Sequence, residues 1–111
     1  MEKKIRKVNL SSIFDDDLAD IFNYGLDTFG RNLAELFVAN IYQHINELPL
    51  LFLIYPECCH LETKNQIYRN IILGKYLIIY RIKANKIEVL RALHGSQSPE
   101  VIKATKKIKT K

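Results

Sequence analysis

The chain has 111 residues, of which 48% are hydrophobic, and a formal net charge of +5. This length suffices for one compact hydrophobic core and excludes two ordinary domains. The longest apolar run, residues 48–55, is interrupted by Pro49 and is far shorter than the roughly 20 residues that a membrane-spanning helix needs. The charged N-terminus lacks the apolar stretch of a secretory signal, so we expect a cytoplasmic protein with no membrane partner.

The charge is unevenly distributed along the chain. Residues 1–62 contain five Lys/Arg and ten Asp/Glu, a net of −5, whereas residues 63–111 contain twelve Lys/Arg and two Asp/Glu, a net of +10. A basic half of this kind favours acidic or phosphate-rich partners. The alternative is a basic surface that keeps the protein soluble and binds no specific partner.

The N-terminal part predicts a strand and then a helix. Residues 3–10 alternate loosely between basic and apolar side chains, which indicates a short edge strand whose lysines oppose unwanted pairing. Ser11 or Ser12 then caps a helix, because a hydroxyl accepts from the free N–H groups of the first turn, and the aspartates at 15–17 suit the positive end of the helix dipole. The apolar residues of this helix share one face: Phe14, Leu18, Ile21, Phe22 and Phe29.

A second helix is predicted from Asn32 to about Leu48. Gly30 is placed to end the first helix in a left-handed conformation, and Pro49 is placed to stop the second. The second apolar stripe consists of Ala34, Phe37, Val38, Ile41, Ile45 and Leu48. Two amphipathic helices with so short a connection form an antiparallel pair, whose combined stripe we expect to cover a sheet.

Residues 50–63 change from apolar to polar and contain Pro56, so we predict an ordered crossover rather than a continuous strand. Cys58 and Cys59 are adjacent and pair with each other only in strained geometry, so we expect free thiols in a reducing compartment. Together with His60 they do not make a zinc site, because structural zinc ligands number four and are spaced by two or more residues. We therefore expect no metal and no cofactor.

The segment 66–95 predicts three antiparallel strands. Residues 67–73 and 76–82 are rich in β-branched and aromatic residues, and the Gly74-Lys75 break between them is short enough for a hairpin. A second break at Ala84-Asn85 precedes the third strand, residues 87–93.

These elements predict one α+β domain over residues 1–98. Its N-terminal edge strand is followed by an antiparallel helix pair, which packs on one face of a three- to four-stranded antiparallel sheet. Residues 99–111 are predicted to be a basic C-terminal tail, frayed or weakly helical, that becomes ordered on a partner.

This order of elements resembles the RelE/ParE superfamily of toxins from type II toxin–antitoxin modules, over about residues 4–98. The resemblance is carried by Asp17-Leu18-Ala19-Asp20-Ile21, Gly30, Ala34, Pro56, Tyr68-Arg69, residues 76–82 and 87–90, and Leu93-His94-Gly95. It implies a cognate antitoxin as partner and a hetero-oligomer with it. RelE-like members cleave mRNA on the ribosome, and ParE-like members poison DNA gyrase without nuclease chemistry.

The ParE-like branch is favoured, so we expect no enzyme activity. His94 falls where some RelE-like nucleases place an active-site histidine, but Gly95 replaces the aromatic residue that often follows it. Tyr76 stands where such nucleases carry an arginine. In the RelE-like alternative, a ribosome-dependent endoribonuclease, the cations and one base are supplied by Arg69, Arg81, Arg91 and His94. Cleavage also needs a second proton-transfer group, for which the candidates are Glu57, His60 and Tyr68.

The residues predicted to bind the target or the antitoxin are Tyr68, Arg69, Tyr76, Arg91 and His94. A guanidinium is costly to bury unless it is paired, so Arg69 and Arg91 either meet carboxylates from the helices or, as we favour, point to an exposed face. Arg81 is expected to pair with Glu88 across the second hairpin.

Both faces of the central strand are apolar. We therefore expect an amphipathic or extended antitoxin segment, preferably acidic, on the face away from the helices or in the groove beside them.

Overall fold

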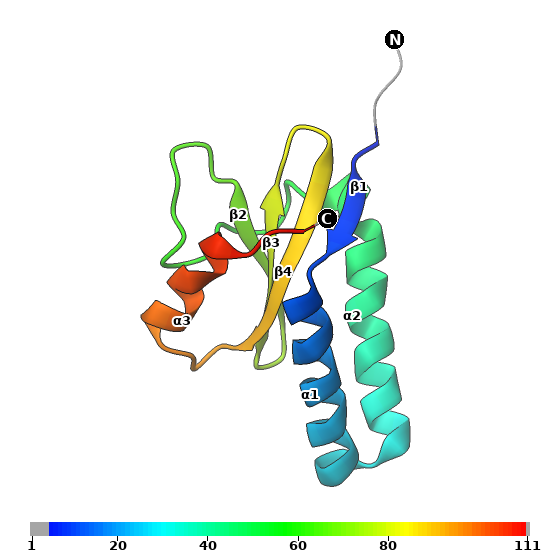
Figure 1. Cartoon of the computed structure of the whole chain (residues 1–111). Helices are drawn as coiled ribbons and strands as arrows, with labels where there is room; N and C mark the ends of the chain where they lie inside the picture. The colour runs from blue at the N-terminus through cyan, green and yellow to red at the C-terminus, as the bar shows by residue number, and fades with distance from the viewer. Residues whose placement is uncertain (1–4, 111) are drawn as a thin grey trace.

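A computed structural model of the protein describes residues 5–110. Two long helices cover one face of a four-stranded sheet, and a short C-terminal helix lies on the other (Figure 1). The elements in chain order are β1 (Lys7–Leu10), α1 (Ser12–Phe29), α2 (Arg31–Leu51), β2 (Tyr68–Leu73), β3 (Tyr76–Ile82), β4 (Lys86–His94) and α3 (Pro99–Ala104), followed by a 3₁₀ turn (Thr105–Lys107). The predicted α+β architecture is confirmed.

One strand departs from the predicted antiparallel sheet. The strand order is β1-β4-β3-β2, and β1 pairs in parallel with β4, whereas the other two pairings are antiparallel. Of the predicted strand 3–10, residues 3 and 4 lie outside the described part of the chain and Lys7–Leu10 forms β1. An apolar pattern sets which face of a strand is buried, but it does not set the direction of the neighbouring strand.

Both hairpins form as predicted. Gly74 adopts a positive φ of 58° in the two-residue loop between β2 and β3, a conformation that glycine enters at little cost. In the β3–β4 pair, Ile79 lies opposite Arg91 but Tyr80 lies opposite Val89, so β4 contains one extra residue, Leu90. Such a bulge bends its strand. Here the bend falls where β1 ends, because the β1–β4 pairing stops at Val89.

The helix ends follow the sequence signals in part. The Ser11 hydroxyl accepts from the N–H of Phe14 at 2.9 Å, and it donates to the carbonyl of Leu90 at 2.6 Å. Gly30 does have a positive φ of 89°, but its ψ of 170° is extended rather than left-handed helical. The prediction that Pro49 stops the second helix is wrong. The helix continues to Leu51, because a proline in the last turn removes one hydrogen bond while Leu48 remains fully buried.

The first core lies between the helix pair and the sheet. Its buried members are Phe14, Leu18, Ile21, Ile41, Ile45, Leu48, Ile71, Ile78, Tyr80, Ile87, Val89 and Ala92. Each large apolar side chain buried here contributes about 1.5 to 3 kcal/mol. Phe29, which we predicted on the buried face, is instead 63% exposed because it lies at the tip of the helix hairpin.

A second core covers the opposite face of the sheet. It contains Cys58, Leu61, Tyr68, Ile79, Leu90, Leu93, Ile102 and Ile108. The last two come from the C-terminal segment, whose helix is capped by the Ser98 hydroxyl. The tail is therefore helical over Pro99–Ala104, one of the two expected states, and the expectation that it is frayed until a partner orders it is wrong. The sheet face that we predicted as an antitoxin site is largely covered by the chain itself. Burying Ile102 and Ile108 on an apolar sheet face is favourable even though lysines surround them in the sequence.

The crossover runs along the outer edge of β2. The N–H of Cys58 donates to the carbonyl of Tyr68 at 2.9 Å, and the N–H of Asn70 donates to that of Pro56 at 3.1 Å. Cys58 is a buried free thiol whose pKa is raised to about 12 by burial, and Cys59 is exposed. Within residues 5–110, no group of three His, Cys, Asp or Glu is arranged to hold a metal ion. In the same residues no helix is long and apolar enough to cross a membrane.

Arg81 and Glu88 form the predicted ion pair across the β3–β4 hairpin. Arg81 Nε lies 2.8 Å from Glu88 Oε1, and the two side chains are only 8% and 3% exposed. Arg81 also donates to the carbonyls of Lys106 at 3.3 Å and Ile108 at 2.8 Å, and the Thr110 hydroxyl donates to Glu88. This buried pair therefore holds the C-terminal segment on the sheet.

The titration of Glu88 predicts a loss of stability in acid. Burial alone would raise the pKa of Glu88, but the hydrogen bonds from Arg81 and Thr110 and the charges of Arg81 and Lys86 lower it from 4.5 to about 2. A carboxylate with a lowered folded-state pKa stabilises the protein above its unfolded-state pKa, and this stability is lost as the pH falls through the folded-state pKa. The expected loss between about pH 5 and pH 2 is about 3 kcal/mol.

Urea unfolding across this pH range measures the loss, with Glu88→Gln as the control. The variant is less stable at neutral pH, but it has no carboxyl group at position 88 to protonate. Its free energy of unfolding should therefore fall by about 3 kcal/mol less than that of the wild type between about pH 5 and pH 2. Parallel profiles for the two proteins would show that Glu88 is not the group responsible.

Candidate partner-binding groove

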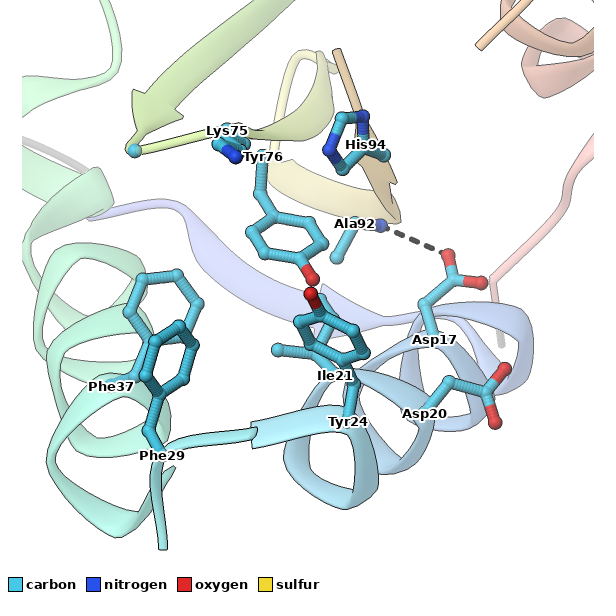
Figure 2. Close-up of a pocket in the computed structure, with 11 residues that line it drawn as sticks. Asp17, Asp20, Ile21, Tyr24, Phe29, Phe37, Lys75, Tyr76, Ala92 and His94 are labelled. Carbon is cyan, nitrogen blue, oxygen red and sulfur yellow. Dashed lines mark hydrogen bonds between the residues drawn. The ribbon is translucent and has the colours of Figure 1, made fainter. Parts of the chain in front are cut away.

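A groove of about 670 Å³ lies between the helix hairpin and the end of the sheet that carries the β2–β3 turn (Figure 2). Its walls come from α1, α2, β3 and β4. The lining residues are Asp17, Asp20, Ile21, Tyr24, Phe29, Phe37, Gly74, Lys75, Tyr76, Ala92 and His94. We call this site the aromatic groove, because four of these side chains are tyrosine or phenylalanine.

Tyr76 is the centre of the aromatic wall. Its ring centroid lies 5.7 Å from that of Phe37 and 5.6 Å from that of His94, the latter pair in an edge-on arrangement. Figure 2 shows the hydroxyls of Tyr24 and Tyr76 pointing toward one another. Burial raises the pKa of the Tyr76 phenol, and the neighbouring Tyr24 raises it further.

The outer part of this wall is open to solvent. Tyr24 is 59% exposed and Phe29 is 63% exposed. Large aromatic side chains that remain accessible are the usual anchors of protein interfaces, since they bury much apolar surface with few rotamers to restrict.

The groove adjoins an apolar recess and has a polar rim. The recess has a volume of about 290 Å³ and is lined by Ile21, Tyr24, Gly25, Phe29, Leu33, Ala34, Phe37 and Tyr76. A Cβ added to Gly25 would lie 3.1 Å from the Cβ of Ala34, so this small pair lets the two helices approach closely beneath the recess. Asp20, Lys75 and His94 supply the rim. An apolar centre surrounded by polar groups is the composition of a protein-binding surface.

Asp17 fixes the position of α1 against β4. Its carboxylate accepts from Arg91 Nε at 2.9 Å and Nη2 at 2.7 Å. It also accepts from the N–H of Ala92 at 3.0 Å, the bond that is drawn in Figure 2. The carboxylate thus satisfies a backbone donor on β4 beyond the point where β1 ends. Arg91 meets a helix carboxylate, which is the less favoured of the two alternatives above, and its hydrogen bonds to Asp17 raise the pKa of Arg91.

Tyr68 and Arg69 lie away from the groove. Arg69 donates to the carbonyls of Gln66 at 3.1 Å, Leu53 at 3.0 Å and Tyr55 at 2.9 Å, which fastens the crossover to β2. Tyr68 is 7% exposed in the second core, and its hydroxyl accepts from Arg81. Of the five predicted binding residues, Tyr76 and His94 line the aromatic groove.

The four residues of the nuclease alternative are not brought together. Arg81 is buried beneath the C-terminal segment, Arg91 is held by Asp17, and Arg69 is held by backbone carbonyls. The groove contains His94 but none of these arginines. His94 Nδ1 accepts from the N–H of Ser96 at 3.1 Å, so one of its ring nitrogens already has a structural partner.

Sequence reasoning missed Tyr24 and Lys75 as groove residues and placed Phe29 and Phe37 in the core. Helical periodicity predicts which residues share a face of the helix, but it does not predict where the sheet that covers this face ends. The position of Phe29 next to the Gly30 turn was the available signal.

Comparison with known proteins identifies a matching family and similar solved structures. The family described as "ParE toxin of type II toxin-antitoxin system, parDE" matches residues 8–99. A solved structure titled "Chromosomal ParDE TA system from P. aeruginosa" matches with a TM-score of 0.68 at 17% sequence identity, covering 83% of this chain and 98% of that chain. At this identity the structural match shows a shared fold. No curated protein matches the chain.

Proposed function

Since the chain belongs to the ParE toxin family of type II toxin–antitoxin systems, we propose that it poisons DNA gyrase and that an antitoxin segment bound in the aromatic groove neutralises it. The toxin then acts by binding a protein and carries out no chemistry of its own. The cognate antitoxin is its partner in a hetero-oligomer.

The placement of the arginines supports a binding toxin over a nuclease. Cleaving RNA requires cations that face the developing phosphorane charge and two groups that transfer protons. Arg69, Arg81 and Arg91 instead donate to acceptors within the chain and lie on three different strands. No step of RNA cleavage is assigned to them.

The shape and chemistry of the aromatic groove fit an amphipathic antitoxin segment. The apolar recess takes one bulky side chain, and the exposed rings of Tyr24 and Phe29 cover its flanks. Lys75 on the rim favours a carboxylate of the segment, and Asp20 on the opposite rim favours a cation. We place Tyr76 and His94 in contact with the segment. Arg91 supports the groove by holding Asp17 of α1 against β4, whereas Tyr68 and Arg69 fasten parts of the fold away from the groove.

Purified gyrase and relaxed plasmid test the target. We expect the chain to block supercoiling or to trap cleaved DNA, and we expect the antitoxin encoded beside it to reverse the effect. Primer extension on translated mRNA tests the alternative in parallel. Codon-dependent cuts without any effect on gyrase would overturn the proposal in favour of ribosome-dependent cleavage.

Antitoxin binding tests the groove through Tyr24 and Phe29. The double variant Tyr24→Ser and Phe29→Ser should weaken antitoxin binding by about 30-fold or more, because truncating anchor residues costs about 2 kcal/mol or more. Both side chains are exposed, so the melting temperature should change little. Isothermal titration calorimetry measures the affinity.

The matched control is Leu50→Ser and Leu53→Ser. These side chains are 82% and 63% exposed, Leu50 in the last turn of α2 and Leu53 in the turn that follows it. The control should bind the antitoxin with wild-type affinity. If the two double variants lose the same antitoxin affinity, then the antitoxin does not bind specifically in the aromatic groove.

A further inference from the structure

Cationic side chains gather at the end of the sheet opposite the aromatic groove. In the β1–β4 ladder, Lys7 lies directly opposite Lys86. Arg6 reaches the β3–β4 turn, where its Nε donates to the carbonyl of Lys83 at 2.8 Å. With Lys109 of the C-terminal segment these residues form a surface that we call the cationic end: Arg6, Lys7, Lys83, Lys86 and Lys109.

The C-terminal segment is fixed at this end by specific contacts. Arg81 holds the carbonyls of Lys106 and Ile108, and Thr110 bonds Glu88. Figure 1 shows the segment running across β3 and β4 toward β1. Lys83, Lys86 and Lys109 consequently line one hollow of about 500 Å³, together with Arg81, Ala84, Asn85, Glu88 and Thr110. Residues far apart in the sequence thus contribute to one charged surface.

This positive charge is largely uncompensated. Glu88 is the acidic residue in the hollow, and it is buried and already bonded to Arg81 at 2.8 Å and to Lys86 at 3.5 Å. Among the described residues, Lys7, Lys83 and Lys109 are exposed and form no ion pair with a carboxylate. A concave surface of one sign concentrates ions of the opposite sign.

We propose that the cationic end binds the phosphodiester backbone of duplex DNA. A lysine ammonium group binds a phosphate as a point charge and needs no particular orientation. Contacts of this kind carry no sequence preference. A protein partner is disfavoured because lysine is depleted in protein interfaces, which rely on aromatic and arginine anchors.

A single strand is disfavoured because proteins hold it by stacking its bases on exposed aromatic rings. Among the described residues, the exposed tyrosine and phenylalanine rings are Tyr24, Phe29 and Tyr42, all on the two long helices. Phe52, which contacts the cationic end, is covered by the guanidinium of Arg6 at 4.5 Å from its ring centroid.

The salt dependence of DNA binding tests the proposal. Fluorescence anisotropy with a short labelled DNA duplex gives the affinity of the purified chain at several salt concentrations. The variant Lys83→Gln with Lys109→Gln should lower the slope of log K against log salt by about 2, because each phosphate contact contributes about 0.9 to the slope. Neither lysine side chain has an ion pair within the described residues, so the fold should be retained, as circular dichroism will show.

Arg31→Gln with Lys103→Gln is the matched control, since it also removes two positive charges at exposed positions, but outside the cationic end. It should keep the wild-type slope. Equal losses in both variants, or tighter binding of single-stranded DNA or polyglutamate than of the duplex, would overturn the proposal. The assay contains no gyrase, so its outcome is independent of the proposed target.

Discussion

Deleting residues 99–111 is expected to lower the free energy of unfolding by about 3 to 6 kcal/mol, because Ile102 and Ile108 each contribute about 1.5 to 3 kcal/mol by burial. These side chains are 2% and 9% exposed on the second face of the sheet. The deletion also removes two acceptors of Arg81, the carbonyls of Lys106 and Ile108, and the Thr110 partner of Glu88. Urea unfolding of the truncated and full-length chains measures the loss.

The double variant Ile102→Ala and Ile108→Ala separates burial from the contacts of the main chain. It should reproduce most of the loss, whereas Lys103→Ala, at an exposed position of α3, should change stability little. A truncated chain as stable as the full-length protein would make residues 99–111 a true appendage, as we first expected from their composition.

Replacing Arg81 by methionine should cost about 3 to 5 kcal/mol, because it leaves the Glu88 carboxylate buried without its main partner. Glu88 is 3% exposed and lies between Arg81, Lys86 and Thr110. The variant should also loosen the C-terminal segment, since the carbonyls of Lys106 and Ile108 lose their donor. Chemical denaturation gives the first effect, and amide hydrogen exchange over residues 99–110 gives the second.

The double variant Arg81→Met and Glu88→Leu is the control for this result. Removing both charges restores most of the stability when the cost comes from an unpaired buried carboxylate. If the double variant is as unstable as Arg81→Met alone, then the stability depends on the hydrogen bonds to the C-terminal segment and the ion pair contributes little.

The local structure was predictable from short-range signals. Ser11 caps α1, Gly74 turns the first hairpin, and the short Ala84-Asn85 break sets Arg81 opposite Glu88. Each of these signals acts between residues that are close in the sequence, so neighbouring side chains and backbone angles suffice to define it. The same signals supported the α+β architecture, whereas two of the groove residues, Tyr76 and His94, were predicted from the resemblance to the RelE/ParE superfamily.

The arrangement of distant parts depended on the assembled fold. The parallel pairing of β1 with β4, the contact of Arg91 with Asp17 across 74 positions, and the packing of Ile108 on the sheet join segments that no local pattern relates. The aromatic groove exists because the hairpin of α1 and α2 extends beyond the end of the sheet (Figure 1). Tyr24 and Phe29 therefore remain exposed. Periodicity and turn chemistry determine which side of each element is apolar. Which of these apolar sides is buried, and against which element, depends on the packing of the whole chain.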